Sequence, residues 1–458
     1  MHYKREYPCS SEETMAFEKI SVETGRTQFR KRRTRHTKLL YGFLITALIA
    51  IIIGLAVGIP LSQQTSSDPN MQTVQAVLQK YPLIDGHNDL PWQYRQYSRS
   101  KVFSVNLRED TRIQWKDSSD MYDKTFPVLP PQTDIPRLRK GMVGAQFWAV
   151  FASCASTGKD AVRIGFDQLD VIRKFTEKYD DTFELVTTAQ GILDAYLIRN
   201  KIGSLIGLEG GHMIGNTLGV LRSFYALGVR YMTITHSCDT SWADNYKQDL
   251  NSTGSRRGLS VFGETVIKEM NRLGMMIDLS HVAKQTMIDA MNVSAAPVIF
   301  SHSSAFTKCQ HYRNVQDDVL QLVKKNNGLV MVNFYDGYIS KGCLPMNKNQ
   351  STMQDVIDHI NYIKDLIGVD HVGIGADYDG VDTLPVGLED VSKYPDLLAE
   401  IIRQGWTTDD LQKLIGANLI RVFKEVERIK ESQRNISPFE DILPENEAVP
   451  GRTCYTSF

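Results

Sequence analysis

The sequence predicts an α/β protein: a (β/α)8 barrel of the TIM type, forming an ectodomain behind a single N-terminal transmembrane helix. Three features predict it: one long uncharged run, eight short apolar runs after it, and helix-like stretches between most of those eight. The chain has 458 residues, 42% hydrophobic and 23% charged, which excludes a disordered chain, a collagen-like fibre and a polytopic membrane protein. The net charge of −1 gives no global field for nucleic acid, so no nucleic-acid partner is expected.

The uncharged run covers residues 39–61 and predicts a transmembrane signal anchor. At about 1.5 Å per residue, its length matches a hydrocarbon core of about 30 Å. A buried core helix of this length would show a polar face, and a cleaved signal has a shorter apolar region of about 7–15 residues. Basic residues crowd the preceding segment 1–38, so the positive-inside rule predicts a cytosolic tail and a type II topology. The rest of the chain would then be extracellular or luminal.

Composition divides the remaining chain. Residues 62–75 are expected to form a stalk, residues 76–430 the (β/α)8 catalytic domain and residues 431–458 a polar, extended C-terminal tail. The tail ends without an apolar segment, so no GPI anchor is expected. All N-glycosylation sequons follow the predicted span, in agreement with the topology; they lie at Asn251, Asn292, Asn349 and Asn435.

Eight apolar runs that end in polar residues predict the strands. They cover residues 82–89, 144–151, 203–210, 230–237, 274–281, 296–303, 328–334 and 371–379. Helical periodicity predicts helices at residues 216–228, 258–274, 283–291, 353–368, 391–405 and from Thr408 to about Lys430. Strands that alternate with helices indicate a parallel sheet, and eight such units indicate a closed barrel, although an open doubly wound sheet would give the same pattern. Residues 90–140 are expected to form an irregular excursion between the first two strands.

The polar residues at the ends of these runs predict a metal site. Active-site residues of a parallel barrel come from the C-terminal ends of its strands. Histidines and carboxylates gather at those ends: His87, Asp89, Glu209, His236, His281, His302 and Asp377. Burying so many ionisable groups in one mouth is costly unless cations balance the carboxylates.

His87 and Asp89 lie two residues apart on an extended strand, so both side chains point toward the same ion. Imidazole combined with carboxylate suits Zn²⁺, with Mn²⁺ and Co²⁺ as alternatives. Glu209 has two oxygens and can bridge to a second ion, which His281 and His302 would complete. Two such ions, about 3.5–4 Å apart, hold a bridging water or hydroxide and polarise a carbonyl.

Asp377 is the expected general base and acid, because a carboxylate there can take a proton from that water and pass it to a leaving amine. The cysteines carry a separate prediction. An odd number follows the predicted span, so one is expected to pair between chains, and Cys454 near the C-terminus is the candidate. A free thiol at Cys454 is the alternative.

Long motifs along the chain carry a family resemblance. They are IDGHNDLPWQ (84–93), IGLEGGH (206–212), TITHSCDTSWADN (233–245), IDLSHV (277–282), VIFSHSSA (298–305), RNVQDDVL (313–320), VMVNFY (330–335), GADYDGV (375–381) and GLEDVSKYPDL (387–397). In this order they resemble the membrane dipeptidase (renal dipeptidase) family, of the metallo-dependent amidohydrolase type, over about residues 76–430. The resemblance implies a binuclear zinc dipeptidase on a (β/α)8 barrel.

The resemblance also assigns roles. It implies that His87 and Asp89 bind one zinc ion, that His281 and His302 bind the other, and that Glu209 bridges the two. Each position holds the residue type that the family motif requires.

Three further residues take roles by resemblance: His236 contacts the substrate near the scissile carbonyl, Arg313 holds its free carboxylate, and Asp377 is the acid and base. A guanidinium binds a carboxylate through a bidentate fork, so Arg313 would place cleavage one residue from the C-terminus. Without the resemblance, Arg313 would be interpreted as a surface arginine at a helix start.

By resemblance, Cys154 pairs with Cys238, Cys309 pairs with Cys343, and Cys454 forms the interchain bond of a homodimer. The chain departs from the family in its anchor. Familiar vertebrate members have a cleaved signal peptide and a GPI anchor, whereas this chain has a predicted signal anchor and no GPI signal.

The expected function is that of a membrane-anchored extracellular zinc dipeptidase acting on dipeptides with a free C-terminal carboxylate. Cys-Gly conjugates and leukotriene D4 are substrate classes that the resemblance implies, and a β-lactam amide is a further candidate. The alternative is a non-catalytic binding ectodomain that retains the fold. A degenerate site would be expected to lose a metal ligand or Asp377, and the sequence keeps them all.

Overall fold

The computed structural model describes residues 68–116, 130–250 and 258–444. The predicted cytosolic tail (1–38), the transmembrane segment (39–61), the sequon at Asn251 and Cys454 lie outside these residues. Within the described ranges, none of the helices combines the length and the apolar character that crossing a bilayer demands.

Eight parallel strands close into a barrel, as the sequence predicts. The strands are β1 (Leu83–Asn88), β2 (Val143–Phe151), β4 (Ile202–Glu209), β5 (Val229–Thr233), β6 (Met276–Asp278), β7 (Ile299–Phe300), β8 (Leu329–Val332) and β9 (Val372–Ile374). Pairing of β2 with β4 and of β9 with β1 completes the ring, so the open doubly wound alternative is wrong. Each strand falls within or against one of the eight predicted runs.

A short additional strand, β3 (Phe183–Leu185), was not expected from the sequence. It pairs with the first residues of β4. β5 pairs with the later residues of β4, along the same edge of that strand. Only Phe183 of its three residues is buried, so the segment lacks the continuous apolar run by which the barrel strands are recognised.

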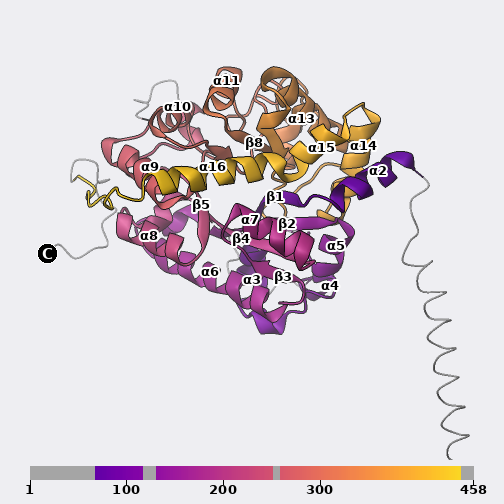
Figure 1. Cartoon of the computed structure of the whole chain (residues 1–458), viewed down its shortest axis with the longest axis horizontal. Helices are drawn as coiled ribbons and strands as arrows, with labels where there is room; N and C mark the ends of the chain where they lie inside the picture. Colours follow the sequence, from indigo (N-terminus) through magenta and orange to yellow (C-terminus); the bar gives the residue numbers. More distant parts are fainter. Residues whose placement is uncertain (1–67, 117–129, 251–257, 445–458) are drawn as a thin grey trace, which may run out of the picture. The chain divides into compact units, whose positions relative to one another are not determined.

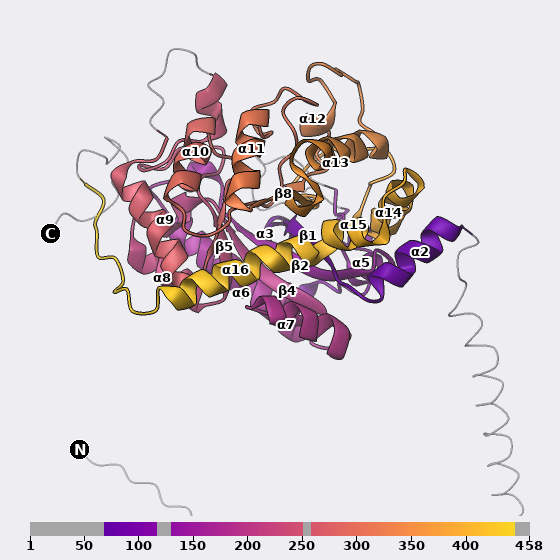
Figure 2. The same ribbon diagram turned by 45° about the horizontal axis from the view of Figure 1, so that its top comes forward.

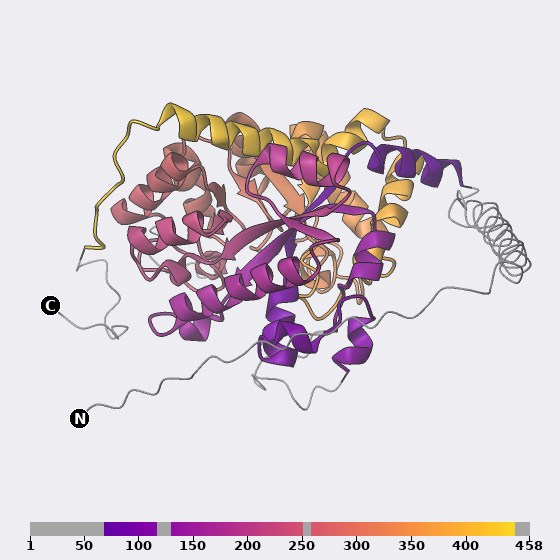
Figure 3. The ribbon, with the colours of Figure 1, turned by 60° about the horizontal axis from the view of Figure 1, so that its bottom comes forward.

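Helices surround the strands (Figure 3). Those of two turns or more are α2 (Pro69–Leu78), α3 (Leu90–Ser98), α6 (Ala161–Lys178), α8 (Leu218–Ala226), α9 (Val261–Leu273), α10 (Lys284–Val293), α11 (Asp317–Asn326), α13 (Met353–Ile367), α14 (Tyr394–Arg403) and α16 (Asn418–Ser432). The shorter ones are α4 (Thr111–Gln114), α5 (Ile135–Lys140), α7 (Ala189–Leu193), α12 (Asp336–Ile339) and α15 (Thr408–Gln412). Each predicted helical stretch overlaps at least one of these helices, and the excursion at 90–140 contains α3, α4 and α5.

Two helices depart from the predicted boundaries. The expected stalk boundary at residue 75 falls inside α2, whose Val74 and Leu78 are fully buried. The helix predicted from Thr408 to Lys430 is interrupted before α16, because Gly416 leaves helical geometry where its backbone approaches the carbonyl of Pro82 at the start of β1.

The long helix α16 lies across the barrel (Figures 1 and 2). Its Ile420, Phe423 and Val426 join the interior cluster that contains Met276 and Leu329, the first residues of β6 and β8. α16 therefore packs against the end of the barrel at which the strands begin, and the opposite end carries the polar residues.

Candidate metal centre and active site

The predicted site residues meet at the C-terminal end of the barrel. His87 is the last residue but one of β1 and Glu209 ends β4, while His236, His281, His302 and Asp377 follow β5, β6, β7 and β9. Glu209, His236, His281 and Asp377 line one cavity of about 380 Å³, together with Asp89 and Arg313. His87 and His302 are fully buried.

Two sets of potential ligands share Glu209. In the first, Nε2 of His87 lies 3.2 Å from Oδ2 of Asp89 and 3.5 Å from Oε1 of Glu209. In the second, Nε2 of His281 and Nε2 of His302 lie 3.1 and 3.4 Å from the same Glu209 oxygen and 2.9 Å from each other. Within each set the ligand atoms lie inside 4.8 Å of one another, as binding to a common ion requires. The structure thus brings the five predicted ligands together, and a third set of His87, His302 and Asp377 lies equally close.

Hydrogen bonds set the orientation of two imidazoles. The hydroxyl of Tyr231 donates to the carbonyl of Gly86 at 3.1 Å, so it accepts from Nδ1 of His87 at 2.9 Å. We infer the tautomer from this network, and it directs Nε2 of His87 toward the carboxylates.

His302 is oriented in the same way through a serine. Oγ of Ser301 donates to Oδ2 of Asp278 at 2.6 Å and therefore accepts from Nδ1 of His302 at 2.7 Å. Nε2 of His302 is then free to face Glu209. In both His87 and His302, a hydrogen bond at Nδ1 thus fixes the ring so that Nε2 faces the candidate metal site.

The electrostatics of the site favour a cation. Burial lowers the pKa of His281 and of His302 well below the usual imidazole value, so both rings are neutral, the form that binds metals. Burial also lowers the pKa of His87, but Tyr231 and the carboxylates of Glu209 and Asp89 outweigh it and hold that pKa well above its usual value. Positive charge is therefore favoured beside Nε2 of His87.

The residues present fit a metal. Nε2 of His87 is buried and has no hydrogen-bond partner among the described residues, although two carboxylate oxygens lie within 3.5 Å. Neutral imidazole nitrogens and carboxylate oxygens are the donors that Zn²⁺ takes in catalytic sites.

Asp377 lies beside the first ligand set. Its Oδ1 is 3.9 Å from Nε2 of His87, and burial raises the pKa of its carboxyl well above the usual value. Its φ of 68° and that of His281, also 68°, lie in the left-handed region, which non-glycine residues seldom adopt outside turns and functional sites. A carboxyl with a raised pKa can both accept and return a proton near neutral pH.

Arg313 enters the cavity from the segment before α11. It is 1% exposed, its guanidinium donates to Oγ of Ser303 and to the carbonyl of His302 at 3.2 Å each, and it lies 5.1 Å from the ring of Tyr338. Among the described residues no carboxylate lies within 4.0 Å of it, and its Nε has no partner. A buried cation without a counter-ion is suited to an anionic ligand.

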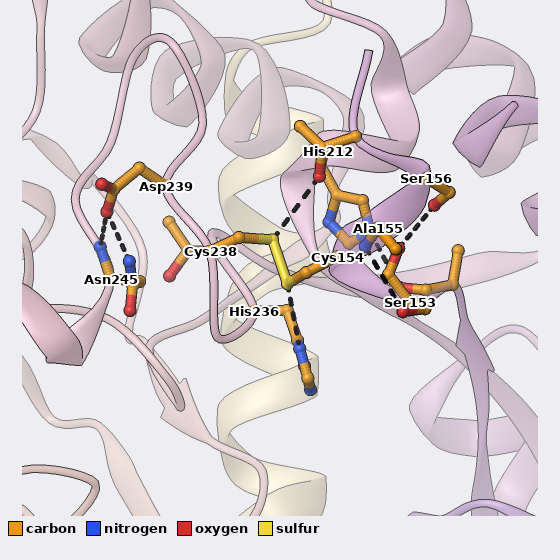
Figure 4. The surroundings of a disulfide bond; sticks show 12 residues. Ser153, Cys154, Ala155, Ser156, His212, His236, Cys238, Asp239 and Asn245 are labelled. Atoms are coloured by element: carbon orange, nitrogen blue, oxygen red, sulfur yellow. Dashed lines mark hydrogen bonds between the residues drawn. A yellow bond between two sulfur atoms is a disulfide. The ribbon is translucent and has the colours of Figure 1, made fainter. Parts of the chain in front are cut away.

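His236 stands at the edge of the cavity, with its side chain 18% exposed and Nε2 3.7 Å from Oε1 of Glu209. Its Nδ1 lies 3.6 Å from Sγ of Cys154 (Figure 4). Burial lowers the pKa of His236 well below its usual value, so the ring is neutral.

Both implied disulfides within the domain are confirmed, Cys154–Cys238 and Cys309–Cys343. Of the predicted sequons, Asn292, Asn349 and Asn435 are exposed.

Sequence reasoning missed the residues that hold the ligands. Asp85 lies two residues before His87, so both side chains point to the same face of β1. The carboxylate of Asp85 accepts hydrogen bonds from Tyr394, Gln146 and the backbone of Ala376. The two-residue spacing from His87 could have identified Asp85. Tyr231 and Ser301 carry no such signal, and neither do the cavity-lining Lys247, Tyr335, Tyr338 and Asp382.

Comparisons with known proteins agree with this geometry. The family profile described as membrane dipeptidase (peptidase family M19) matches residues 71–437. Dipeptidase 3 of Rattus norvegicus is 43% identical over 394 residues, which cover 85% of this chain and 74% of the rat protein. Dipeptidase 3 of Homo sapiens is 43% identical over 375 residues, covering 81% of this chain and 70% of the human protein.

Solved structures share the fold. A metallo peptidase from Rhodobacter sphaeroides, liganded with a phosphinate mimic of the dipeptide L-Ala-D-Ala, has a TM-score of 0.63 and 22% identity and covers 76% of this chain and 99% of its own. At that identity the likeness shows the barrel fold. The family match and the curated relatives go further: the chain belongs to the membrane dipeptidase family, peptidase family M19, and is a dipeptidase, a hydrolase of the metallopeptidase type.

Proposed function

We propose that this chain is a membrane-anchored, extracellular dipeptidase that uses two zinc ions bridged by Glu209 to hydrolyse dipeptides with a free C-terminal carboxylate. The observation that carries the proposal is the pair of candidate ligand sets that share Glu209, which lines the same cavity as Arg313. Arg313 is buried and has no carboxylate within 4.0 Å among the residues that the structure describes. A site for cations and a site for a carboxylate, so close together, suit a small zwitterionic substrate.

His87 and Asp89 would hold one ion, and His281 and His302 the other. When bound, the two ions polarise a carbonyl oxygen and lower the pKa of a water molecule, as amide hydrolysis at neutral pH requires. Tyr231 and Ser301 keep the imidazoles of His87 and His302 turned toward Glu209.

Arg313 would bind the substrate carboxylate with its two-pronged guanidinium and thereby fix which peptide bond is cut. His236 would contact the substrate near the scissile carbonyl. The Asp377 carboxyl, whose pKa is raised by burial, would take a proton and deliver it to the leaving amine nitrogen. Cys-Gly conjugates, leukotriene D4 and β-lactams are the substrate candidates. A phosphinate mimic of a dipeptide, such as the one bound to the Rhodobacter sphaeroides relative, is proposed to bind at the same place.

The proposed setting of the enzyme follows from the residues outside the described part. Residues 39–61 would anchor the chain in the bilayer with residues 1–38 in the cytosol, and Cys454 would link two chains. The exposed sequons at Asn292, Asn349 and Asn435 are proposed glycosylation sites, together with Asn251.

The test is hydrolysis of a dipeptide panel by the purified full chain in detergent, with bound metal counted in the same samples. We expect about two zinc ions per chain, loss of turnover after chelation, and recovery when zinc is restored. Dipeptides amidated at the C-terminus should be poor substrates. A folded, zinc-loaded chain that hydrolyses no dipeptide would instead support the non-catalytic binding ectodomain. If Mn²⁺ or Co²⁺ restored turnover after chelation and Zn²⁺ did not, zinc would be rejected as the metal.

A further inference from the structure

The disulfide Cys154–Cys238 joins two loops that the barrel does not pair. Cys154 follows β2 and Cys238 follows β5, whereas β2 and β5 each pair with β4, which lies between them. The bond therefore crosses the end of β4, where Glu209 stands.

The disulfide also contacts a residue of the site. His236 lies two residues before Cys238, and its Nδ1 is 3.6 Å from Sγ of Cys154 (Figure 4). Its Nε2 faces Glu209 at 3.7 Å. The sulfur is thus at one nitrogen of the ring and the reaction site at the other. Cys154 itself lines the cavity.

Little else connects the two loops. Each has internal hydrogen bonds, such as Ser156 with Ser153 in the first and Asn245 with Asp239 in the second (Figure 4). Within the described residues, the hydrogen bonds between loop 152–160 and loop 234–245 both involve a disulfide sulfur. They join Cys154 to His236 and Thr157 to Cys238.

Among the described residues, the His236 ring also stacks against two neighbouring rings. Its centroid lies 4.3 Å from that of His281 and 4.9 Å from that of Phe151. Stacking limits the tilt of the ring but does not select between its two flipped orientations, which exchange Nδ1 with Cδ2 and Nε2 with Cε1. The contact of Nδ1 with the sulfur selects the orientation in which Nε2 faces Glu209.

We infer that the Cys154–Cys238 disulfide is a positioning element for His236: it places the imidazole over Glu209 and is required for turnover beyond its effect on stability. The inference rests on the proposed function, because it assigns His236 a part in hydrolysis. A displacement of about 1 Å in a positioned group is enough to lower a rate by about 100-fold.

The second disulfide offers a matched comparison. Cys309–Cys343 also lies at the C-terminal end of the barrel, but it joins the segment of Arg313 to the segment after Tyr338, and within the described residues no hydrogen bond joins it to His236. Removing it tests the general effect of losing a disulfide at the same end of the domain.

The experiment is a double-mutant cycle on the metal-loaded full chain. Cys154→Ser with Cys238→Ser is combined with His236→Ala, and Cys309→Ser with Cys343→Ser is combined with His236→Ala. We expect the first pair to lower kcat about tenfold or more with KM changed less than about twofold, and to have almost no further effect once His236 is alanine. Removing the second disulfide should lower kcat by the same factor in the wild-type background and in the His236→Ala background.

Equal losses from the first pair with and without His236 would overturn the inference, and so would an unchanged kcat. If the serine pair does not fold, the folded Cys309→Ser, Cys343→Ser chain is treated with a phosphine reductant while its metal content is counted. We then expect kcat to fall and to return on reoxidation, and a reduced chain with full kcat and full metal would also overturn it.

If the wild-type chain hydrolyses no dipeptide, the proposed function fails on its own. The same cycle is then run on the calorimetric affinity for the phosphinate dipeptide mimic, which needs no turnover. Coupling between the first pair and His236 would support the positioning, and additive losses would reject it.

Discussion

Arg313 shows how a residue can be placed for a ligand rather than for stability. Its guanidinium is buried without a carboxylate partner among the described residues, which is unfavourable for the fold and favourable for an anionic substrate. Arg313→Met should therefore raise KM for dipeptides about tenfold or more without lowering the melting temperature. Steady-state kinetics and thermal unfolding check this.

Arg313→Lys is the control, because it keeps the charge and loses the fork, and an intermediate KM is expected. An unchanged KM in Arg313→Met would remove Arg313 from substrate binding.

Tyr231 tests whether a hydroxyl outside the ligand set controls metal binding. Tyr231→Phe removes the acceptor of Nδ1 of His87 and should weaken zinc binding about 10–100-fold, as competition with a chromogenic chelator would measure. Tyr94→Phe is the matched control, because the Tyr94 hydroxyl is buried without a hydrogen-bond partner in the described part of the chain. Equal zinc affinities of wild type and Tyr231→Phe would show that His87 needs no support.

At the residue scale, the sequence predicts the candidate ligands that the structure brings together, but not the residues that orient them. His87, Asp89 and Glu209 stand out because ionisable side chains end apolar runs. Tyr231 and Ser301 do not stand out, because a tyrosine or a serine in or next to a strand is ordinary. Tyr231 of β5 meets His87 of β1 only once the barrel has closed, because these two strands are not neighbours in the sheet. The part of Ser301 appears only in its hydrogen bonds to Asp278 and His302.

Strand β4 leaves room for Tyr231 because it carries a glycine next to that ring. Gly207 faces the ring of Tyr231, and a Cβ there would lie 2.0 Å from Cζ of that ring. Gly207→Ala should displace Tyr231 from His87, lowering stability by about 1–3 kcal/mol and also weakening zinc binding. Denaturant unfolding and chelator competition measure the two effects.

Gly219 in α8 is the control for this substitution, since a Cβ added there would meet nothing within 4 Å. Gly219→Ala should be neutral or stabilising by up to about 1 kcal/mol, with unchanged zinc affinity. A Gly207→Ala chain that matches it in both measurements would contradict the crowding argument.

Helix α13 carries a histidine that links loops at the C-terminal end. Nδ1 of His359 accepts from the backbone of Ala305 at 3.0 Å, and Nε2 donates to the carbonyl of Ile339 at 2.9 Å. Burial lowers the pKa of His359 to about 4. The unfolded chain, with a pKa near 6.5, then binds the proton first, so stability is present above pH 6.5 and is lost as pH falls toward 4.

His359→Gln keeps a donor and an acceptor without titrating. Between pH 6 and pH 4.5, the free energy of unfolding of the wild type should fall more steeply than that of the variant, by about 1.4 kcal/mol per pH unit. Urea unfolding at several pH values measures both slopes, and parallel curves would exclude His359 as an acid-labile link.

At the element scale, the prediction succeeds where burial gives a continuous apolar run. All eight barrel strands, even the two-residue β7, lie within such runs or against them. β3 is missed because only Phe183 is buried, and the interruption before α16 is missed because it depends on Gly416 meeting Pro82, far away in the sequence.

At the scale of the whole molecule, the two ends of the barrel carry different features. α16 packs against the end where the strands begin, and the metal-ligand sets, Arg313 and both disulfides gather at the other end. The eightfold alternation predicts the barrel, and the strand ends predict the site. The loops that follow the strands are less predictable, because their disulfides depend on which strand ends the folded barrel brings close together.

Assembly is a prediction for the full chain. Cys454 is expected to link two chains, so wild type should run as a dimer on non-reducing gels and Cys454→Ser as a monomer. Cys9→Ser is the control and should remain a dimer, because Cys9 is expected on the cytosolic side of the membrane. A Cys454→Ser chain that still runs as a dimer would assign the link to another cysteine.

The disulfide over the end of β4 has a consequence for maturation. A disulfide forms in an oxidising compartment and not in a reducing cytosol, whereas the candidate metal ligands come from the ends of strands that pair with one another in the barrel. With His236 positioned as inferred, a newly made chain would bind metal before it could turn over substrate. Oxidation of Cys154 and Cys238 would then raise turnover by about tenfold or more over that of the reduced chain.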